Sequence, residues 1–496
     1  MLYWSLLLLP LLLRLVPGRG DQPWRTAVDV PLALLVGTLS GLLCGLWLAQ
    51  FYLRVGTVEG SPDFLEYCWS TGAFLYSLGD HISGNRSRAA GLLSGLLARR
   101  LGVLDGLLWA AILSTSILSA ACHLWARSLH SRTAGILAGL AVSTVPCLCV
   151  LSRTLTYYPP IIATLVLCAA GGTVAMRWRT VVGCAVAGLG AGLALLIDAR
   201  GLPWALVTVS LGGLAALVGH RGTRLRAPLR LLALGLPLVW SFQVGPWAFP
   251  DGAASLVSQV SVARDLRRVG VYVDDAQIPE RPSEGFVWGR SSLLLIPDTL
   301  VFVSGQSVLI TEEARAGRTS VDKKALHVTP WVPLVSGAAV LAVLGLVRQP
   351  LLLFAALASA LPFVLSLDSA IVVKQSGARF LANAAPFVPL VLGLAGGVLA
   401  GRRGLRVPGV RGDGLRLLAV LVLGVLVVLG VVPTFLSTVA PWRVSVDTSQ
   451  RAVERARDVV AGTREPKNPA DTQCASVLAT NPEDGRWVDL LTDWDQ

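Results

Sequence analysis

Charged residues are scarce in this sequence. They make up 15% of its 496 residues, while hydrophobic residues make up 54%. A soluble globular protein carries about 25% charged residues. So few charges cannot cover a water-facing surface, which excludes an ordinary soluble fold. A bilayer must supply most of the solvent, and the sequence predicts an all-α polytopic membrane protein.

The local motifs of common soluble enzymes are also absent. There is no P-loop, no GxGxxG, no HExxH and no GxSxG. The five histidines are widely spaced, and the eight cysteines form no CxxC pair. No cofactor is therefore expected, and no cluster demands a metal. Cys68 and Cys474 both fall in predicted external segments and could pair in an oxidising compartment. The other six read as small buried hydrophobes: Cys44, Cys122, Cys147, Cys149, Cys168 and Cys184.

Apolar stretches long enough for membrane helices run through most of the chain. A span needs about 20 residues, and Gly and Pro are tolerated within it. Residues 1–17 are apolar around Arg14 and lack a signal-peptide cleavage site, so they read as a twelfth span or an interfacial helix. Eleven further spans are predicted at 31–53, 106–126, 133–152, 159–176, 180–197, 202–219, 231–249, 331–347, 350–367, 380–400 and 417–436.

The positive charge sets the orientation. The net charge is +12, and its arginines occur in short runs between alternate spans, which is typical of cytoplasmic loops rather than of a nucleic-acid surface. Segments 54–105 and 250–330, the turns near 153–158, 198–201 and 368–379, and the tail 437–496 then lie outside. The sequence predicts a transmembrane domain at 1–436 and an external tail. Its Leu, Ala, Gly, Val and Arg bias suggests a GC-rich bacterium, hence a multi-pass protein of the inner membrane.

An acidic string follows the first predicted span on the external side. It reads Ser61-Pro62-Asp63-Phe64-Leu65-Glu66-Tyr67, with the two carboxylates one helical turn apart. A carboxylate at a membrane boundary can act as a general base towards an acceptor hydroxyl or amine. Pro62-Asp63 is also an ordinary helix start, and the string alone does not decide between the two. Residues 86–104 repeat apolar side chains at helical spacing, which predicts an amphipathic helix on the membrane surface.

Four cations fall at predicted external helix ends. They form a candidate site for a phosphate, because arginine offers a planar fork and lysine a point charge. Each one alone could equally be a side chain that extends to the interface. The four are Arg153, Arg200, Lys374 and Arg379.

From about residue 31 to 400 the chain resembles the GT-C superfamily of polytopic glycosyltransferases. It is most similar to the protein-mannosyltransferase and aminoarabinose-transferase-like branch. The family's catalytic Asp matches Asp63, while its second acidic residue is displaced here to Glu66. The strings Asp198-Ala-Arg200-Gly-Leu and Arg379-Phe-Leu, the latter leading to Pro386, also resemble family segments. Tyr157 or Tyr158 stands where the family often has Asp.

The resemblance implies transfer of a sugar from a polyprenyl-phosphate donor to a glycan, lipid or protein acceptor on the external side. Asp63 would be the general base with Glu66 beside it, and the four cations would hold the donor phosphate. Tyr67, Tyr157 and Tyr158 would line the substrate pocket. Two alternatives stay open. A lipid or lipid-linked-sugar flippase would need polar residues inside several spans, where Arg14 and Gln243 are the main candidates. A non-catalytic component of envelope glycan assembly would use Asp63 only as a helix cap.

Overall fold

The computed structural model describes residues 26–55, 88–101, 103–145, 148, 158–198, 201–218, 227–248, 331–347, 349–366, 385–400 and 461–463. Within these ranges every regular element is a helix. The α-helices are α2 (Thr26–Val55), α4 (Leu92–Leu101), α5 (Val103–Leu129), α6 (Arg132–Ala141), α8 (Tyr158–Trp178), α9 (Val181–Ile197), α10 (Leu202–Leu217), α11 (Ala227–Ala248), α17 (Trp331–Leu346), α18 (Pro350–Ser366) and α20 (Phe387–Ala400). Two short 3-10 helices, η2 (Arg88–Gly91) and η3 (Val142–Thr144), accompany them.

A described helix occupies each predicted span from 31–53 to 380–400, which confirms an all-α polytopic architecture. The predicted spans at 417–436 and 1–17 lie outside the described residues. Two of these helices have bounds within the described residues that the sequence did not predict. In the third span, regular helix ends before Val145, whose backbone is extended because Pro146 follows it. In the described part of the span at 380–400, helix begins at Phe387, after the turn at Ala385–Pro386.

Four helical segments in the described part of the chain are long and apolar enough to cross a membrane: Ala27–Gly45, Gly106–Leu129, Tyr158–Trp178 and Ala227–Ala248. Helices α9 and α10, and the apolar parts of α17, α18 and α20, are shorter. The bundle is therefore made of helices of unequal length.

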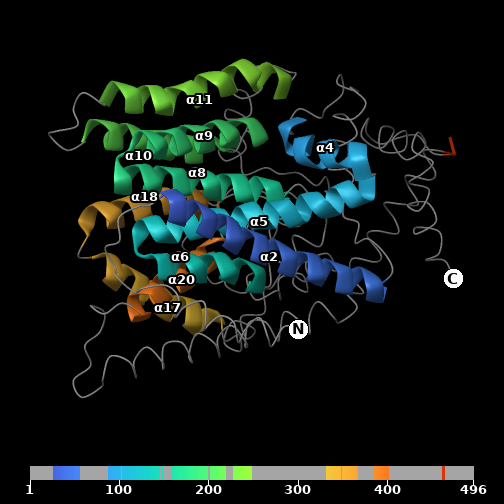
Figure 1. Cartoon of the computed structure of the whole chain (residues 1–496), viewed down its shortest axis with the longest axis horizontal. Helices are drawn as coiled ribbons and strands as arrows, with labels where there is room; N and C mark the ends of the chain where they lie inside the picture. The colour runs from blue at the N-terminus through green and yellow to red at the C-terminus, as the bar shows by residue number, and fades with distance from the viewer. Residues whose placement is uncertain are drawn as a thin grey trace, which may run out of the picture.

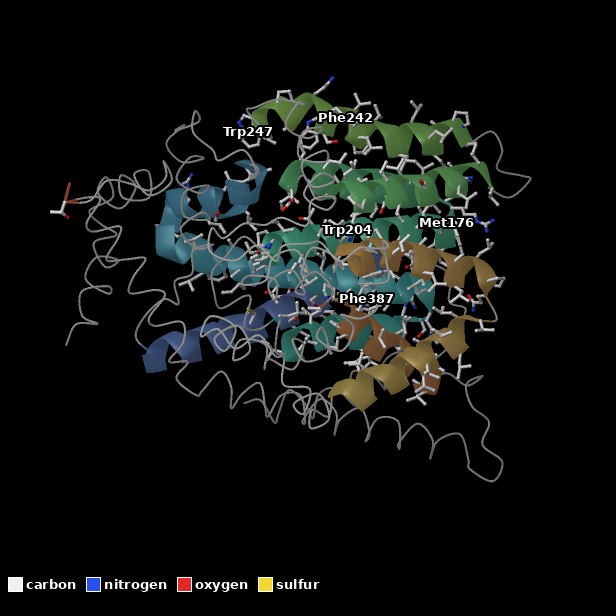
Figure 2. The ribbon with its side chains drawn as sticks, turned by 180° about the vertical axis from the view of Figure 1, so that it is seen from behind. Met176, Trp204, Phe242, Trp247 and Phe387 are labelled. Atoms are coloured by element: carbon white, nitrogen blue, oxygen red, sulfur yellow. The ribbon has the colours of Figure 1, made fainter. Side chains whose placement is uncertain are left out.

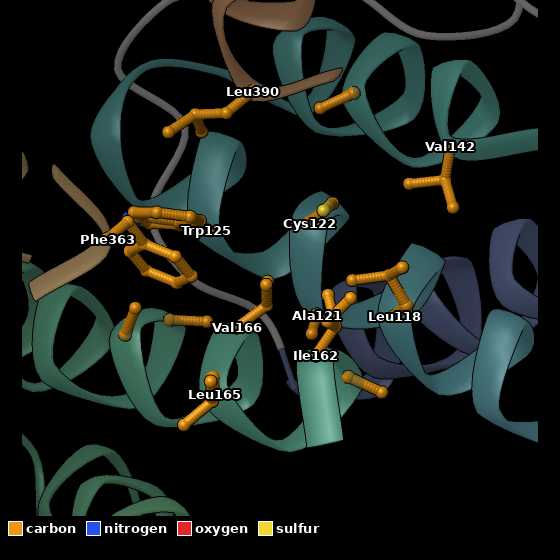
Figure 3. Packing of buried hydrophobic residues seen from close by; sticks show 14 of the residues in the cluster. Leu118, Ala121, Cys122, Trp125, Val142, Ile162, Leu165, Val166, Phe363 and Leu390 are labelled. Carbon is orange, nitrogen blue, oxygen red and sulfur yellow. The ribbon is translucent and has the colours of Figure 1, made fainter. Parts of the chain in front are cut away.

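The helices lie side by side, with α11 at one edge and α17 near the other (Figure 1). Helix α5 packs against α2, α6 and α8, while α9 lies between α8 and α11. Leu118, Trp125, Ile162 and Val166 belong to the core that α5 and α8 share (Figure 3). In the most apolar part of α8, 94% of the residues are buried, against 17% in α11. Helix α8 is thus central, and α11 lies at the edge of the bundle with about half of its residues exposed.

Small residues let these helices approach closely. A side-chain carbon added at Gly37 of α2 would lie 2.6 Å from the carbonyl oxygen of Ser116 in α5, and Gly41 meets the Ser116 hydroxyl. Gly190 of α9 would come within 2.8 Å of the Cα of Cys168 in α8. Apolar burial supplies no net drive between helices in lipid, so close contacts of this kind hold membrane bundles together.

The helix predicted at 86–104 is present as η2 followed by α4, and α4 packs against α5. Leu92 and Leu96, one turn apart, are both exposed. The two leucines give α4 an apolar outer stripe, as a helix lying on a membrane surface requires.

Candidate functional site

Three helix ends that are far apart in the sequence meet in an aromatic cluster. It comprises Trp204 in the first turn of α10, Phe363 in the last turn of α18, Phe387 at the start of α20, and Trp125 of α5. The ring centre of Phe363 lies 5.2 Å from that of Trp204, 5.1 Å from Phe387 and 5.6 Å from Trp125. In Figure 2, Trp204 and Phe387 lie in the middle of the bundle, whereas Phe242 and Trp247 lie on α11 at its edge.

The aromatic cluster flanks the predicted phosphate-binding cations. Arg200 precedes Trp204 by four residues, and Lys374 and Arg379 fall between Phe363 and Phe387. The cluster therefore brings together the ends of the segments that carry these three cations. The cations themselves, and Arg153, lie outside the described residues, so their assignment stays a prediction.

Tyr158 is the one predicted site residue that the structure describes. It is the first residue of α8, only 3% exposed, and belongs to the same buried core as Trp204 and Phe363. The segment carrying Arg153 and Tyr157 thus ends at the buried core to which the aromatic cluster belongs. A role for Tyr158 in a substrate pocket stays a prediction, as do the roles of Asp63, Glu66, Tyr67 and Tyr157, which lie outside the described ranges.

The end of the first external segment lies close to the α9–α10 turn. Ala89 of η2 packs against Leu196 in the last turn of α9 and Ala248 at the end of α11. Two residues after Leu196, Asp198 ends α9, and its carbonyl accepts a 2.8 Å bond from the Gly201 N–H. The segment that contains Asp63 and Glu66 therefore returns to the bundle beside Asp198, which is 4% exposed.

Contacts between helices fix the depth of the α9–α10 turn. Thr208 of α10 donates a 3.0 Å bond to the carbonyl of Cys168 in α8, and Ser128 of α5 bonds to Thr173 of α8 at 2.7 Å. The C-terminal ends of α5 and α8 meet where Arg127 lies 5.7 Å over Trp178, so these helices are parallel. Helix α9 returns antiparallel along α8, which makes α10 parallel to both.

Thr208 is level with Cys168, and Thr173 is level with Ser128. Counting back from these pairs along the parallel helices places Leu202, the first residue of α10, level with Ile117 of α5. The apolar span of α5 begins eleven residues earlier, at Gly106. At the helical rise this is about 16 Å. The α9–α10 turn therefore lies well inside the bundle. The external position that the sequence predicts for this turn stays a prediction.

Helix α2 also extends beyond the level of the α9–α10 turn. Its Gly41 lies against Ser116 of α5, and fourteen further residues lead to Val55. Those residues cover about 21 Å. Figure 1 shows α2 and α5 running past the ends of α8, α9 and α10 on one side of the bundle. The predicted acidic string begins six residues after α2 ends.

A charged cluster at the opposite end was not identified from the sequence. The fully buried Asp29 of α2 accepts bonds from Arg127 Nε at 3.1 Å and from Arg132 Nε at 2.7 Å. Nearby, Arg177 donates a 2.9 Å bond to Gln349. Arginines from two predicted cytoplasmic loops, with Gln349 beside a third, thus lie at one end of the bundle. The signal for Asp29 was available, since an acid in the first turn of a helix suits the helix dipole.

The buried polar atoms without a hydrogen-bond partner in the described part of the chain include both ring nitrogens of His123 in α5 and Nε1 of Trp204. Such groups are uncommon in native proteins and call for an explanation. Among the described residues there is no group of three or more His, Cys, Asp or Glu side chains that could hold a metal ion.

No protein-family model and no curated protein matches the chain. Among solved structures, it is similar to the Archaeoglobus fulgidus oligosaccharyltransferase in its apo form, at 11% identity and a TM-score of 0.44, over 90% of this chain and 59% of that one. It is also similar to ArnT from Cupriavidus metallidurans bound to undecaprenyl phosphate, at 13% identity and a TM-score of 0.49, over 92% and 88% of the two chains.

The chain thus spans about three-fifths of the archaeal structure and most of the ArnT structure. At such low identity, these similarities do not by themselves assign an activity to the chain.

Proposed function

We propose that the chain is a membrane glycosyltransferase of a bacterial inner membrane that takes a sugar from a polyprenyl-phosphate donor. One observation carries the proposal. The helix ends that flank Arg200, Lys374 and Arg379 converge on one level of the bundle, that of the rings of Trp204, Phe363 and Phe387, and Tyr158, which follows Arg153 in the chain, belongs to the same buried core. An amphiphilic donor with its tail in the bilayer and its phosphate near such a level would meet cations from three separate segments.

The chemistry that suits this arrangement is displacement at the anomeric carbon. The acceptor oxygen or nitrogen forms a bond to that carbon as the bond to the phosphate oxygen breaks, which inverts the configuration. Asp63 takes the acceptor proton, with Glu66 beside it. Arg153, Arg200, Lys374 and Arg379 stabilise the negative charge that develops on the departing lipid phosphate. Tyr67, Tyr157 and Tyr158 line the pocket, and the acceptor is a glycan, a lipid or a protein.

The length of the segment between the end of α2 and Asp63 supports the role of Asp63. Val55 ends α2 about 21 Å above the level of Gly41 and Ser116. Eight residues lead from Val55 to Asp63, and an extended chain of that length spans up to about 27 Å. The acidic string can therefore return to the level of the α9–α10 turn, where the first external segment also ends.

The test is deletion of the gene in its host, with complementation by wild type or Asp63→Asn, followed by mass spectrometry of lipid-linked sugars and envelope glycans. We expect deletion to accumulate one polyprenyl-phosphate sugar, which wild type clears and Asp63→Asn does not. The accumulated lipid would name the donor. Full restoration by Asp63→Asn at equal expression would show that Asp63 is not the base.

Lipid transport is the second candidate, and His123 is the observation that favours it. This titratable side chain is fully buried inside a membrane span, which is typical of transport pathways. Gln243, the polar span residue expected from the sequence, is instead exposed on α11. A transporter predicts that Asp63→Asn restores the lipid profile, whereas His123→Leu does not.

A further inference from the structure

Helix α11, at the edge of the bundle (Figure 1), carries a polar side chain on the side that faces away from the other helices. Its buried side chains recur at helical spacing and face the bundle: Arg230, Leu234, Ser241 and Ala248. Gln243 follows Leu234 by nine residues, about two and a half turns, so it points in the opposite direction. It is exposed, and it lies five residues, about 7 Å, inside the end of the apolar span Ala227–Ala248.

The amide of Gln243 needs a hydrogen-bonding partner at this depth. Acyl chains offer neither donors nor acceptors, so an amide placed among them loses its hydration without compensation. Glutamine in membrane helices instead hydrogen-bonds to a neighbouring helix. The exposed leucines of α11 by themselves would indicate only contact with lipid. Gln243 among them indicates that another helix covers this side of α11.

Gln243 belongs to a stripe of exposed side chains that runs along the helix, which we call the α11 stripe. Its members alternate at spacings of three and four residues: Leu229, Leu232, Leu236, Val239, Gln243 and Pro246. The four aliphatic members are each more than half exposed. This spacing is that of the seam between two helices that cross at about 20°, the usual geometry of paired membrane helices. The α11 stripe therefore suits lengthwise packing against one further helix.

A second copy of the chain is the partner that fits this stripe. Copies insert in the membrane with the same orientation, so a two-fold axis between them runs along the membrane normal and places both Gln243 side chains at one depth. An amide carries donor N–H groups and an acceptor oxygen, so two Gln243 amides satisfy each other. Arg230 is the one charged residue in the sequence from Ala227 to Ala248, and it is 5% exposed on the bundle side. No charge therefore opposes the pairing of two stripes.

We propose that the chain forms a homodimer through the α11 stripe, in which the Gln243 amides of the two copies hydrogen-bond to each other. The inference goes beyond the proposed function and does not depend on it. Because Trp204 and Phe387 of the aromatic cluster lie in the middle of the bundle (Figure 2), each copy keeps its own candidate site.

The first test measures the dissociation constant of the dimer for the full chain in lipid vesicles, from energy transfer between labelled copies at increasing dilution. Gln243→Leu makes the stripe fully apolar, which lipid would tolerate, but removes the amide pair. We expect its dissociation constant to rise about three- to thirty-fold, the usual effect of a hydrogen bond between membrane helices. Phe242 is 70% exposed but lies about 100° around the helix from Gln243, so Phe242→Leu should keep the wild-type value.

Disulfide cross-linking in native membranes tests the same side of α11 with the amide left in place. On oxidation, Val239→Cys should cross-link two copies above the wild-type background, because position 239 is in the stripe, and Phe242→Cys should not. The inference is overturned if wild type is monomeric in vesicles, if Gln243→Leu dimerises as tightly as wild type, or if Phe242→Cys cross-links as efficiently as Val239→Cys. A chain whose stripe is covered by another of its own segments, such as the predicted span at 417–436, would give the monomeric result.

Discussion

At the end of the bundle where Arg127 and Arg132 meet, stability depends on the carboxylate of Asp29. It is fully buried and accepts bonds from Arg127, which is 1% exposed, and from Arg132. Removing one member of a buried ion pair leaves the other charge uncompensated, which costs about 3–5 kcal/mol. We expect Asp29→Asn to lower stability by about 3 kcal/mol or more, measured as the loss of monodisperse protein after heating in detergent.

A second variant shows whether charge is the cause. In the double variant Asp29→Asn with Arg127→Leu, the uncompensated guanidinium is removed and part of the lost stability should return. If the double variant is less stable than Asp29→Asn alone, the cluster contributes through packing rather than through charge. The sequence could not indicate this pair, because Asp29 and Arg127 are 98 residues apart and each reads alone as an ordinary charge at a membrane boundary.

At the scale of the helix, the contact between α2 and α5 depends on the absence of a side chain at Gly37. A Cβ there would lie 2.6 Å from the Ser116 carbonyl oxygen, a backbone atom that cannot move aside easily. We expect Gly37→Ala to destabilise the protein by about 1–3 kcal/mol, the usual cost of overpacking. The matched control is Gly213→Ala in α10, where nothing lies within 4 Å.

The same substitution should act in opposite directions at the two sites. Gly213→Ala should be neutral or stabilising by up to about 1 kcal/mol, because alanine is the better helix former. Thermal unfolding of both variants in one detergent gives the comparison. Equal midpoints would mean that α2 can move away from α5 at little cost.

Helix positions were largely predictable, and helix depths were not. Hydropathy located the described spans to within a few residues, but it did not indicate the end of regular helix before Val145 or the turn at Ala385–Pro386. The depth of a helix depends on which residues pair across helices, such as Cys168 with Thr208. The hydropathy pattern of one sequence does not show such pairs. The sequence therefore could not show that the α9–α10 turn lies about 16 Å below the start of the apolar span of α5.

For the whole molecule, the end that carries the arginine cluster should face the cytoplasm. The positive-inside rule predicts this orientation. Arg100 in α4 and Val218 after α10 are both exposed and lie on opposite predicted sides. With Cys68 and Cys474 replaced by serine, we expect a membrane-impermeant maleimide to label Arg100→Cys on spheroplasts. Val218→Cys should react only after permeabilisation, and the reverse pattern would invert the predicted topology.

The shortness of the α9–α10 hairpin has a consequence for the membrane around it. Between their caps α9 has 17 residues and α10 has 16, so each is about 25 Å long, less than a typical hydrocarbon core of about 30 Å. Leu189, Leu206 and Leu217 are exposed along this hairpin and must meet acyl chains. Hydrophobic mismatch of this kind is relieved by local thinning of the bilayer. Outer-leaflet headgroups beside α9 and α10 would then sink towards the turn, which shortens the distance that a lipid phosphate must travel into the apolar layer.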